Sequence, residues 1–387
     1  MNIIKKTINR LVFLTLGAVL MTAGMLGVLV ILSPACDMMG TDTLCSYYSD
    51  HYKDGKFHNL AHDDSLKSTE GIVYNTIEYF LSKSGVRVPT ESLNFVNRSK
   101  KEFDQKPASG LRVTWLGHST ALIEIDGKNI LTDPVWGNRA SPVDFAGPKR
   151  FFDCPLDLEE LPHIDAVVIS HDHYDHLCKD TIKYLADKVS LFVVPLRVGD
   201  HLRDWGVDPG KIRELDWWDE ICVDELSLVC TPARHFSGRS MFSKNTTLWS
   251  SWAIIGEKHS VFFSGDTGMT HSFAEIGERL GPFDVTMIET GAYHPRWSDV
   301  HIGPENAVKA HIALKGKILL PIHWGTFNLS KHSWTEPAER LTAAAQKNGV
   351  DFAIPYPGES LEPTDTYTTQ CWWPKCPWKT AEEAPIH

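Results

Sequence analysis

The chain has 387 residues, 42% of them hydrophobic, and its formal net charge is −11. A chain of this length can bury one large core or two modest ones. A surface that binds nucleic acid must neutralise phosphates with Lys and Arg, so the acidic balance argues against a nucleic-acid partner. No sequence repeat of about 20–50 residues is visible, which argues against solenoids and repeat arrays.

The first 35 residues are predicted to form a membrane anchor or a signal. Lys5, Lys6 and Arg10 precede residues 11–32, which carry no charge. A membrane helix needs about 20 apolar residues, whereas a signal-peptide core usually has about 7–15. Basic flanks stay in the cytoplasm, so we expect the rest of the chain to be periplasmic or otherwise extracytoplasmic. The alternatives are a cleaved signal, a lipoprotein attached at Cys36, and a buried helix.

Three further parts are predicted: an N-terminal extension (36–110), a main domain (111–360) and a C-terminal tail (361–387). Within the extension, residues 69–82 have helical spacing of apolar positions. Residues 111–134 predict strands with a hairpin at Asp126-Gly127, two residue types that tolerate positive φ. Residues 304–311 predict a helix that begins with a proline in its first turn.

The sequence H-D-H-Y-D-H at residues 171–176 is the most informative stretch of the chain. It follows residues 164–169, a short run rich in Val and Ile that predicts a buried strand. Imidazole and carboxylate groups suit a borderline divalent ion such as zinc. One ion can be held by the two histidines at positions 171 and 173, and a second by the Asp and His at positions 175 and 176. The alternative is a polar loop of solvated histidines.

Three later residues complete this ligand set: His235, Asp266 and His323. Each follows another apolar run, at residues 226–230, 261–265 and 318–322 respectively. A single histidine after a strand is usually a surface or core residue, but four strand ends with ligand-type residues favour a metal site. An aspartate can also bridge two ions through its two carboxylate oxygens.

The order H-x-H-x-D-H, then His, then G-D-T-G, then H-W-G resembles the metallo-β-lactamase superfamily. Further blocks resemble the N-acylphosphatidylethanolamine-hydrolysing phospholipases D. They are T-W-L-G-H-S (114–119), L-T-D-P (131–134), G-P-K-R-F (147–151), E-L-D-W-W (214–218), G-A-Y (291–293), P-R-W (295–297) and H-W-G-T-F (323–327). The similarity covers about residues 53–360 and is dense from 111 to 328.

The resemblance implies an α/β fold, an αββα sandwich with a dinuclear zinc site on one edge, over residues 111–360. It also implies two sets of zinc ligands and one bridging residue: His171, His173 and His235; Asp175, His176 and His323; and Asp266.

The same resemblance makes Asp175 and Asp266 catalytic and places Tyr174 and His301 close to the substrate phosphate. The animal members of the family carry a glutamine next to that last histidine, where this chain has Val300. Headgroup contacts at this position are therefore expected to differ.

The function expected from these residues is hydrolysis of a phosphodiester in a phospholipid such as N-acylphosphatidylethanolamine. Two zinc ions lower the pKa of a shared water and neutralise charge on a phosphoryl oxygen, so no serine nucleophile is required. The absence of a G-x-S-x-G motif agrees with this mechanism. The alternatives are a lactonase of the ascorbate-6-phosphate type and a non-enzymatic, zinc-stabilised envelope protein.

The eight cysteines are compatible with an oxidising compartment. The close pairs Cys36/Cys45 and Cys371/Cys376 could form disulfides, whereas Cys178, Cys222 and Cys230 are expected to be buried free thiols.

The tail contains three tryptophans, Trp372, Trp373 and Trp378. They are expected to pack on the main domain. The alternative is contact with a lipid interface, which tryptophan favours.

Overall fold

The computed structural model describes residues 49–61, 63, 86–240, 242–364, 367 and 371–386. The predicted membrane segment (11–32), the predicted helix at 69–82 and the pair Cys36/Cys45 lie outside the described residues. Within the described part of the chain, no helix is both long and apolar enough to span a membrane. One compact unit, Ser46–Arg239 with Ser243–His387, contains every helix and strand described.

The first large sheet has seven strands in the order β15-β3-β4-β5-β6-β7-β8. Their bounds are β3 Leu111–Gly117, β4 Thr120–Ile125, β5 Lys128–Thr132, β6 Ile164–Val168, β7 Val189–Pro195, β8 Ile212–Leu215 and β15 Ser360–Leu361. Strands β5 to β8 are parallel, and the pairs β15/β3, β3/β4 and β4/β5 are antiparallel.

The second large sheet has six strands in the order β14-β13-β12-β11-β10-β9. Their bounds are β9 Glu220–Val223, β10 Leu226–Thr231, β11 Ser251–Ile255, β12 Ser260–Phe263, β13 Phe283–Glu289 and β14 Gly316–Ile322. Strands β12, β13 and β14 are parallel, and the remaining pairs are antiparallel. A two-stranded ribbon, β1 Tyr52–Lys53 and β2 Lys56–Phe57, completes the strands.

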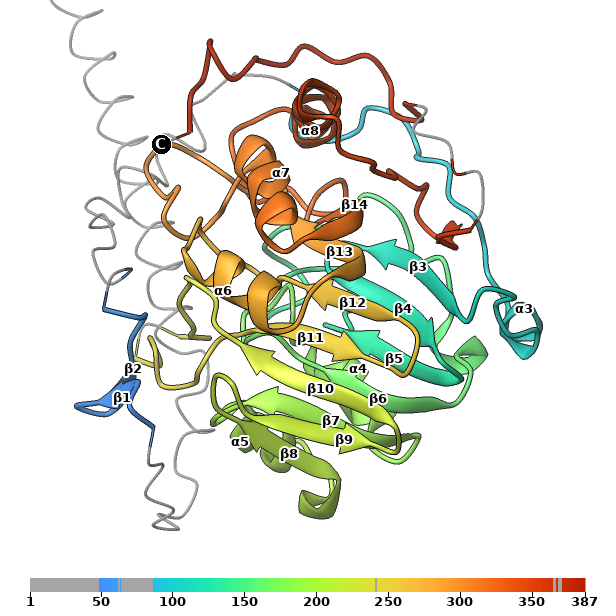
Figure 1. Cartoon of the computed structure of the whole chain (residues 1–387), viewed down its shortest axis with the longest axis vertical. Coiled ribbons are helices and arrows are strands. Elements are labelled where there is room, and N and C mark those ends of the chain that lie inside the picture. Colours follow the sequence, from blue (N-terminus) through green and yellow to red (C-terminus); the bar gives the residue numbers. More distant parts are fainter. Residues whose placement is uncertain are drawn as a thin grey trace, which may run out of the picture. The chain divides into compact units, whose positions relative to one another are not determined.

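Helices cover the outer faces of both sheets (Figure 1). The α-helices are α3 Lys100–Asp104, α4 Lys179–Leu185, α5 Val198–Asp204, α6 Ser272–Arg279, α7 Pro304–Ala313 and α8 Glu336–Asn348, and the 3-10 helices are η2 Leu158–Glu160 and η3 Pro209–Lys211. Helix α5 packs on β7 and β8, whereas α7 packs on β13 and β14 and contacts α6 and α8. The order of layers is helix, sheet, sheet, helix, as expected from the sequence.

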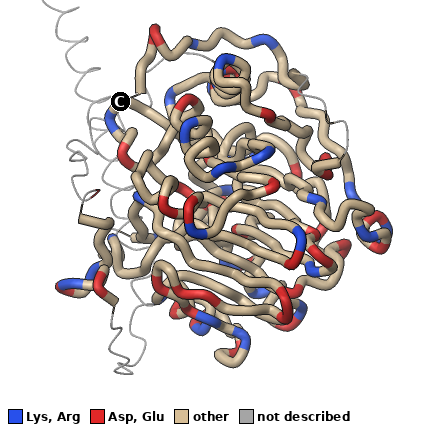
Figure 2. The backbone as a smooth tube through the Cα atoms, viewed as in Figure 1, with Lys and Arg blue, Asp and Glu red and all other residues tan. Residues whose placement is uncertain are grey.

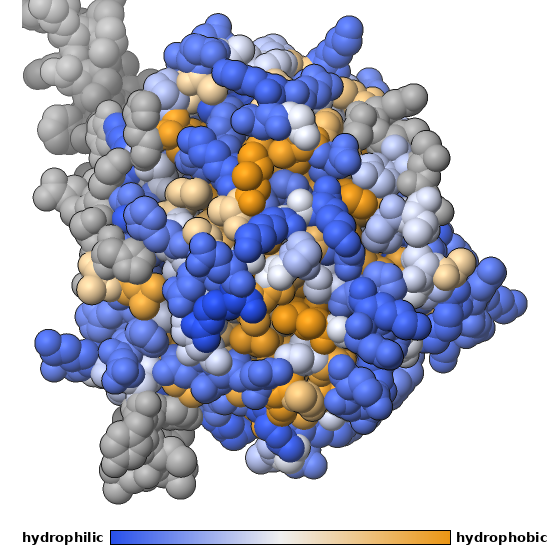
Figure 3. Space-filling view, viewed as in Figure 1, coloured by the Kyte–Doolittle hydropathy of each residue, from blue (hydrophilic) through white to orange (hydrophobic). Residues whose placement is uncertain are grey.

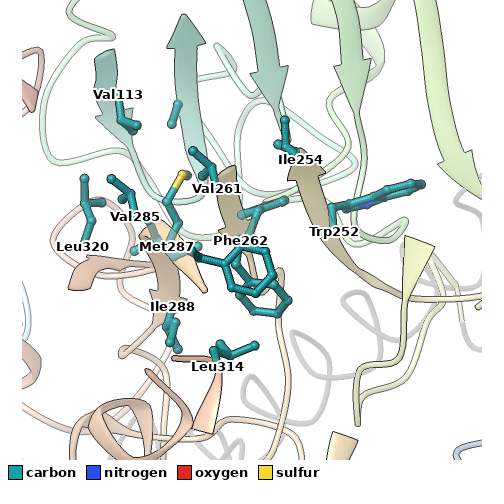
Figure 4. Close-up of a cluster of buried hydrophobic side chains, with 14 of the residues drawn as sticks. Val113, Trp252, Ile254, Val261, Phe262, Val285, Met287, Ile288, Leu314 and Leu320 are labelled. Atoms are coloured by element: carbon teal, nitrogen blue, oxygen red, sulfur yellow. The ribbon is translucent and has the colours of Figure 1, made fainter. Parts of the chain in front are cut away.

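Two apolar clusters explain why both sheets are buried on both faces. The smaller lies between the seven-stranded sheet and helices α4 and α5, and includes Leu122, Ile182 and Leu202. The larger fills the space between the sheets and continues under α6, α7 and α8. Figure 4 shows Val261 directed toward the facing sheet and Phe262, the next residue of β12, on the opposite side of the strand.

Strand direction determines where the functional residues gather. Antiparallel pairing reverses direction at β4 and β11, so β3 runs with β5 and β6, and β10 runs with β12, β13 and β14. The carboxyl ends of these seven strands therefore point to one edge of their sheets. Strands β4 and β11 end at the opposite edge.

The strands and the helix predicted between residues 111 and 322 are confirmed. The predicted strands correspond to β3 to β6, β10, β12 and β14, and the predicted helix to α7. Asp126 and Gly127 form the β4–β5 turn with φ of 46° and 86°. Trp373 is buried in the larger apolar cluster, and Trp372 packs against that cluster.

The predictions for the cysteines need two corrections, because Cys178 is only half-buried and Cys222 is exposed. The described cysteines, Cys371 and Cys376 among them, are free thiols, and Cys230 is buried as expected. Cys222, however, is exposed rather than buried, because it lies in β9 at the end of the sheet, where alternate side chains point to solvent.

The face of the molecule seen in Figures 2 and 3 is largely polar. Acidic and basic residues are interspersed there (Figure 2), and most side chains are hydrophilic, with hydrophobic ones gathered near the centre (Figure 3).

Candidate metal centre

Titratable side chains gather at the edge where the seven carboxyl ends meet. They lie at or shortly after the end of six strands: His118 after β3, residues 171–176 after β6, His235 after β10, Asp266 after β12, Glu289 at the end of β13, and His323 after β14. Most of these side chains are buried, and His173, Tyr174 and Asp175 are half-buried.

The first donor group consists of His171, His173, His235 and Asp266, whose donor atoms lie within 4.8 Å of one another. The Nδ1 atom of His173 is 2.8 Å from Nε2 of His171 and 3.4 Å from Nε2 of His235. Oδ2 of Asp266 is 3.8 Å from Nε2 of His171 and 3.7 Å from Nε2 of His235. The structure thus brings together the residues expected to hold the first ion.

The second donor group consists of His118, Asp175, His176 and His323. Its centre is Oδ2 of Asp175, which lies 2.9 Å from Nε2 of His118, 3.3 Å from Nε2 of His323 and 3.4 Å from Nε2 of His176. Three of the four were expected to hold the second ion, and His118 is an addition.

Asp266 lies between the two groups. Besides its contacts in the first group, its Oδ2 is 3.2 Å from Nε2 of His176, and its Oδ1 is 3.2 Å from Nε2 of His323. One carboxylate therefore faces imidazoles of both groups, as a bridging ligand must.

Hydrogen bonds outside the two groups fix the orientation of three imidazole rings. Nδ1 of His176 donates to Oδ2 of Asp133 at 2.6 Å, and Nδ1 of His235 donates to the Val300 carbonyl at 2.9 Å. Nδ1 of His171 donates to Oγ of Ser170 at 2.8 Å. These hydrogen bonds at Nδ1 turn the Nε2 atom of each ring toward the centre.

The residues fit a pair of divalent cations. Nε2 of His176 and Oδ1 of Asp266 are buried without a hydrogen-bond partner. Both atoms lie among the other candidate metal-ligand atoms of the centre. Unpartnered buried polar atoms are rare in native proteins and often indicate an ion. Nitrogen and carboxylate oxygen donors suit zinc and other first-row metals.

The two groups differ in how their surroundings shift histidine pKa values. Burial, together with the neighbouring imidazoles, holds the pKa of His171 and His235 well below its usual range. Burial also lowers the pKa of His323, but the carboxylates of Asp266 and Asp175 outweigh it and raise that pKa to about 10.

Backbone strain accompanies the second group. His118 and His323 have φ of 55° and 63°, in the left-handed region that such residues seldom adopt. The N–H of His323 donates to the His118 carbonyl at 3.0 Å, and Nε1 of Trp115 donates to the same carbonyl at 2.9 Å. Hydrogen bonds between the two strand ends thus hold both residues in this conformation.

Tyr174 and His301 lie beside the donor groups but in different settings. The hydroxyl of Tyr174 donates to the Arg239 carbonyl at 3.0 Å, and the Arg239 guanidinium lies 3.9 Å from the centre of its ring. Nδ1 of His301 donates to Oε2 of Glu289 at 2.8 Å. The ring of His301 stacks on that of His323, with centroids 5.3 Å apart.

Sequence reasoning missed three residues of this centre: His118, Asp133 and Glu289. Each follows or ends an apolar strand, in β3, β5 and β13, which is the signal that identified the other ligands. Cys178, two residues after the histidine motif, belongs to none of the donor groups found among the described residues.

Comparisons with known proteins agree with this geometry. A family model for the β-lactamase superfamily domain matches residues 128–324. An uncharacterized protein of Mycobacterium tuberculosis is 48% identical over 337 residues, which are 85% of this chain and 88% of that protein. The N-acyl-phosphatidylethanolamine-hydrolyzing phospholipase D 1 of Caenorhabditis elegans is 40% identical over 247 residues, 60% of this chain and 69% of that protein.

A solved structure shares the fold at low sequence identity. Igni18, a metallo hydrolase from the archaeon Ignicoccus hospitalis, superimposes with a TM-score of 0.51 at 22% identity, covering 65% of this chain and 97% of that one. Together with the family match and the clustered His and Asp donors, this identifies the chain as a metal-dependent hydrolase that belongs to the metallo-β-lactamase superfamily.

Proposed function

We propose that the protein is a phosphodiesterase of the phospholipase D type, and that it hydrolyses an amphiphilic phospholipid such as N-acylphosphatidylethanolamine. The observation that carries this proposal is the pair of adjoining donor groups joined by Asp266. Paired metal sites suit in-line displacement at phosphorus, because both the attacking and the leaving oxygen need stabilisation. The similarity to the nematode phospholipase D supports the same substrate class.

We propose two zinc ions as the cofactor, one for each donor group. Ions bound there would act as Lewis acids toward a phosphoryl oxygen and would lower the pKa of a shared water. The chain's own contribution is orientation. Asp133 receives hydrogen bonds from His176 and from both the amide and the hydroxyl of Ser170, which in turn receives one from His171. A single buried carboxylate thereby stabilises one ligand of each group.

His301 is proposed to contact the substrate phosphate, with Tyr174 in a lesser role. The His301 side chain is 15% exposed and lies against rings of both donor groups, with centroids 5.4 Å from His235 and 5.3 Å from His323. The Tyr174 hydroxyl already donates to the Arg239 carbonyl. It must exchange this partner to reach a phosphoryl oxygen, so its removal is expected to cost less than removal of His301.

We further propose that residues 11–32 anchor the protein in a membrane with the catalytic domain on the extracytoplasmic side. The uncharged segment and its basic flank support this orientation. An anchor would keep the centre next to lipid, and this would suit a phospholipid substrate.

The test is a product assay on full-length protein in mixed micelles with N-acylphosphatidylethanolamine, run in heavy-oxygen water. Attack at phosphorus breaks the phosphorus–oxygen bond to the ethanolamine side and places the water oxygen on phosphatidate. We expect labelled phosphatidate and unlabelled N-acylethanolamine. Rapid turnover of lactones with the phospholipid left intact would instead establish a lactonase.

His301→Ala and Tyr174→Phe sharpen the assay. The loss of a well-placed transition-state contact costs about 10²–10³-fold in rate. We expect a loss of that size for His301→Ala, a smaller one for Tyr174→Phe, and unchanged metal content in both. A larger loss for Tyr174→Phe than for His301→Ala would contradict the proposed roles.

A further inference from the structure

Glu289 is a charged residue of the centre that belongs to neither of the two main donor groups. It is the last residue of β13, and its side chain is fully buried. An ionisable carboxylate in such a position needs hydrogen-bond partners, because an uncompensated buried charge is costly. The identity of those partners indicates what the residue does.

The carboxylate of Glu289 contacts three separate loops. Its Oε1 accepts from the amide of Thr267 at 2.7 Å and from the amide of Ile302 at 3.2 Å. Its Oε2 accepts from Nδ1 of His301 at 2.8 Å and lies 3.7 Å from Nδ1 of His323. These contacts tie the residue after the bridging Asp266, the substrate-facing loop at His301 and a ligand of the second group to one side chain.

The hydrogen bond between Glu289 and Nδ1 of His301 determines which ring nitrogen of His301 is available to the substrate. Because an ionised carboxylate only accepts, Nδ1 carries the proton and Nε2 is left with a lone pair, on a side chain that is 15% exposed. Stacking on the ring of His323, with an interplanar angle of 24°, restricts rotation of the His301 ring.

We propose that Glu289 is a positioning residue that holds His301 in the Nδ1–H tautomer with Nε2 directed at the bound phosphodiester. This inference rests on the proposed function, because it assigns His301 to the substrate phosphate. Glu289 acts through His301 and touches no substrate.

The competing interpretation makes Glu289 a metal ligand. Donor atoms of Asp266, Glu289, His301 and His323 also lie within 4.8 Å of one another. The hydrogen bonds argue against coordination, since both oxygens of Glu289 already accept from N–H groups, two on Oε1 and one on Oε2. Metal content separates the two interpretations directly.

The test compares Glu289→Gln with Glu124→Gln in the full-length holoenzyme. Glu124 is an equally buried carboxylate in β4 that accepts from Arg112 at 2.7 Å, outside the centre. For Glu289→Gln we expect unchanged bound metal, a fall of about 10- to 100-fold in kcat and little change in KM. Glu124→Gln should leave kcat unchanged. A loss of metal from Glu289→Gln would overturn the proposal in favour of a ligand role.

A double-mutant cycle tests whether Glu289 acts through His301. In a His301→Ala background, Glu289→Gln should cause no further loss of kcat, because the residue it positions is gone. Additive losses would overturn the proposal.

The tautomer itself can be measured without any substrate. In ¹⁵N-histidine-labelled protein with zinc bound, the His301 resonances, assigned by their loss in His301→Ala, should show a protonated Nδ1. Glu289→Gln should remove this preference. An unprotonated Nδ1 in the wild-type protein overturns the inference even if Glu289→Gln fails to fold. Since this readout involves no turnover, failure of the phospholipase assay leaves it intact, and the two proposals fail separately.

Discussion

The two donor groups contain similar side chains but surround them with different charges. In the first group, imidazoles face one another, and burial together with their mutual repulsion lowers the pKa of His171 and His235. In the second, carboxylates surround the imidazoles. Burial opposes protonation of His176 too, but Asp266 and Asp175 raise its pKa well above the usual range.

This difference bears on how each group would bind a cation. Neutral imidazoles present their lone pairs at once, so the first group needs to release no proton. Histidines that share protons with carboxylates must lose them before they coordinate an ion, so binding to the second group is coupled to proton release. The second group in turn offers more negative charge once those protons have left.

Removal of Asp266 is the strongest test of the contrast between the two donor groups, because this carboxylate contacts imidazoles of both. In Asp266→Ala we expect both ions to bind more weakly and kcat/KM to fall by at least about 10³-fold, equivalent to several kcal/mol of lost charge stabilisation. Metal per chain after desalting measures the first effect, and phosphodiester hydrolysis the second.

Two variants calibrate that result. The double variant His171→Ala/His173→Ala should lose about one ion rather than two, because it removes ligands of the first group only. Asp284→Ala, a substitution of the same kind at a carboxylate that pairs with Lys317 on the surface, should keep full metal content and activity. Full metal content in Asp266→Ala would show that it does not bridge.

A selective effect on the second group is expected for His118→Ala. Burial, followed by repulsion from His323, lowers the pKa of His118 to about 3, so its ring is neutral and its Nε2–H donates to Asp175. Loss of such a partner typically costs about 10- to 100-fold in metal affinity. Chelator competition should therefore show one weakened ion and one unchanged ion. Equal weakening of both would remove the distinction between the groups.

The sequence predicts the centre well where ligands follow apolar runs. His235, Asp266 and His323 each come shortly after a strand, and parallel strand ends meet at one edge, so local pattern and strand direction suffice. Glu289 also ends an apolar strand, but a glutamate there is usually solvated. Its burial depends on amides at Thr267 and Ile302, which only the folded chain brings to it.

Other features depend on contacts that local sequence does not encode. The hydroxyl of Tyr174 donates to a carbonyl 65 residues away in the chain, which limits its access to substrate. Cys222 is exposed because β9 lies at the end of its sheet, and strand order is set by long-range pairing rather than by the apolar pattern of the strand. The resemblance that supplied the ligand pairing likewise gave no role to His118.

The pH dependence of metal binding offers a finer test of the electrostatic difference between the two donor groups. The pKa of His323 is raised to about 10 in the metal-free chain, so below that pH a proton competes with the ion. Affinity of the second group should therefore weaken as pH falls from about 8 to about 6, by up to about tenfold per unit for each proton displaced. The first group, whose histidine pKa values are lowered, should bind with constant affinity over this range. Parallel pH profiles for the two ions would contradict the electrostatic distinction.

The smallest expected effect concerns His311, a histidine outside the donor groups. It tests whether burial lowers histidine pKa values in this protein. His311 in α7 is 3% exposed, its Nδ1 lies 2.7 Å from Oγ1 of Thr286, and burial lowers its pKa to about 4. Between that value and the unfolded pKa of about 6.5, only the unfolded chain binds the proton. The stability from neutral His311 is thus fully present above about pH 6.5 and is lost as pH falls toward 4, by about 1–2 kcal/mol between pH 7 and 5.

In His311→Asn this dependence should disappear, because Asn does not titrate, and urea unfolding at the two pH values measures it. The substitution also removes packing volume, but that cost is the same at both pH values and cancels in the difference. If wild type and variant lose equal stability on acidification, burial does not keep His311 neutral, and the same explanation for the first donor group loses its support.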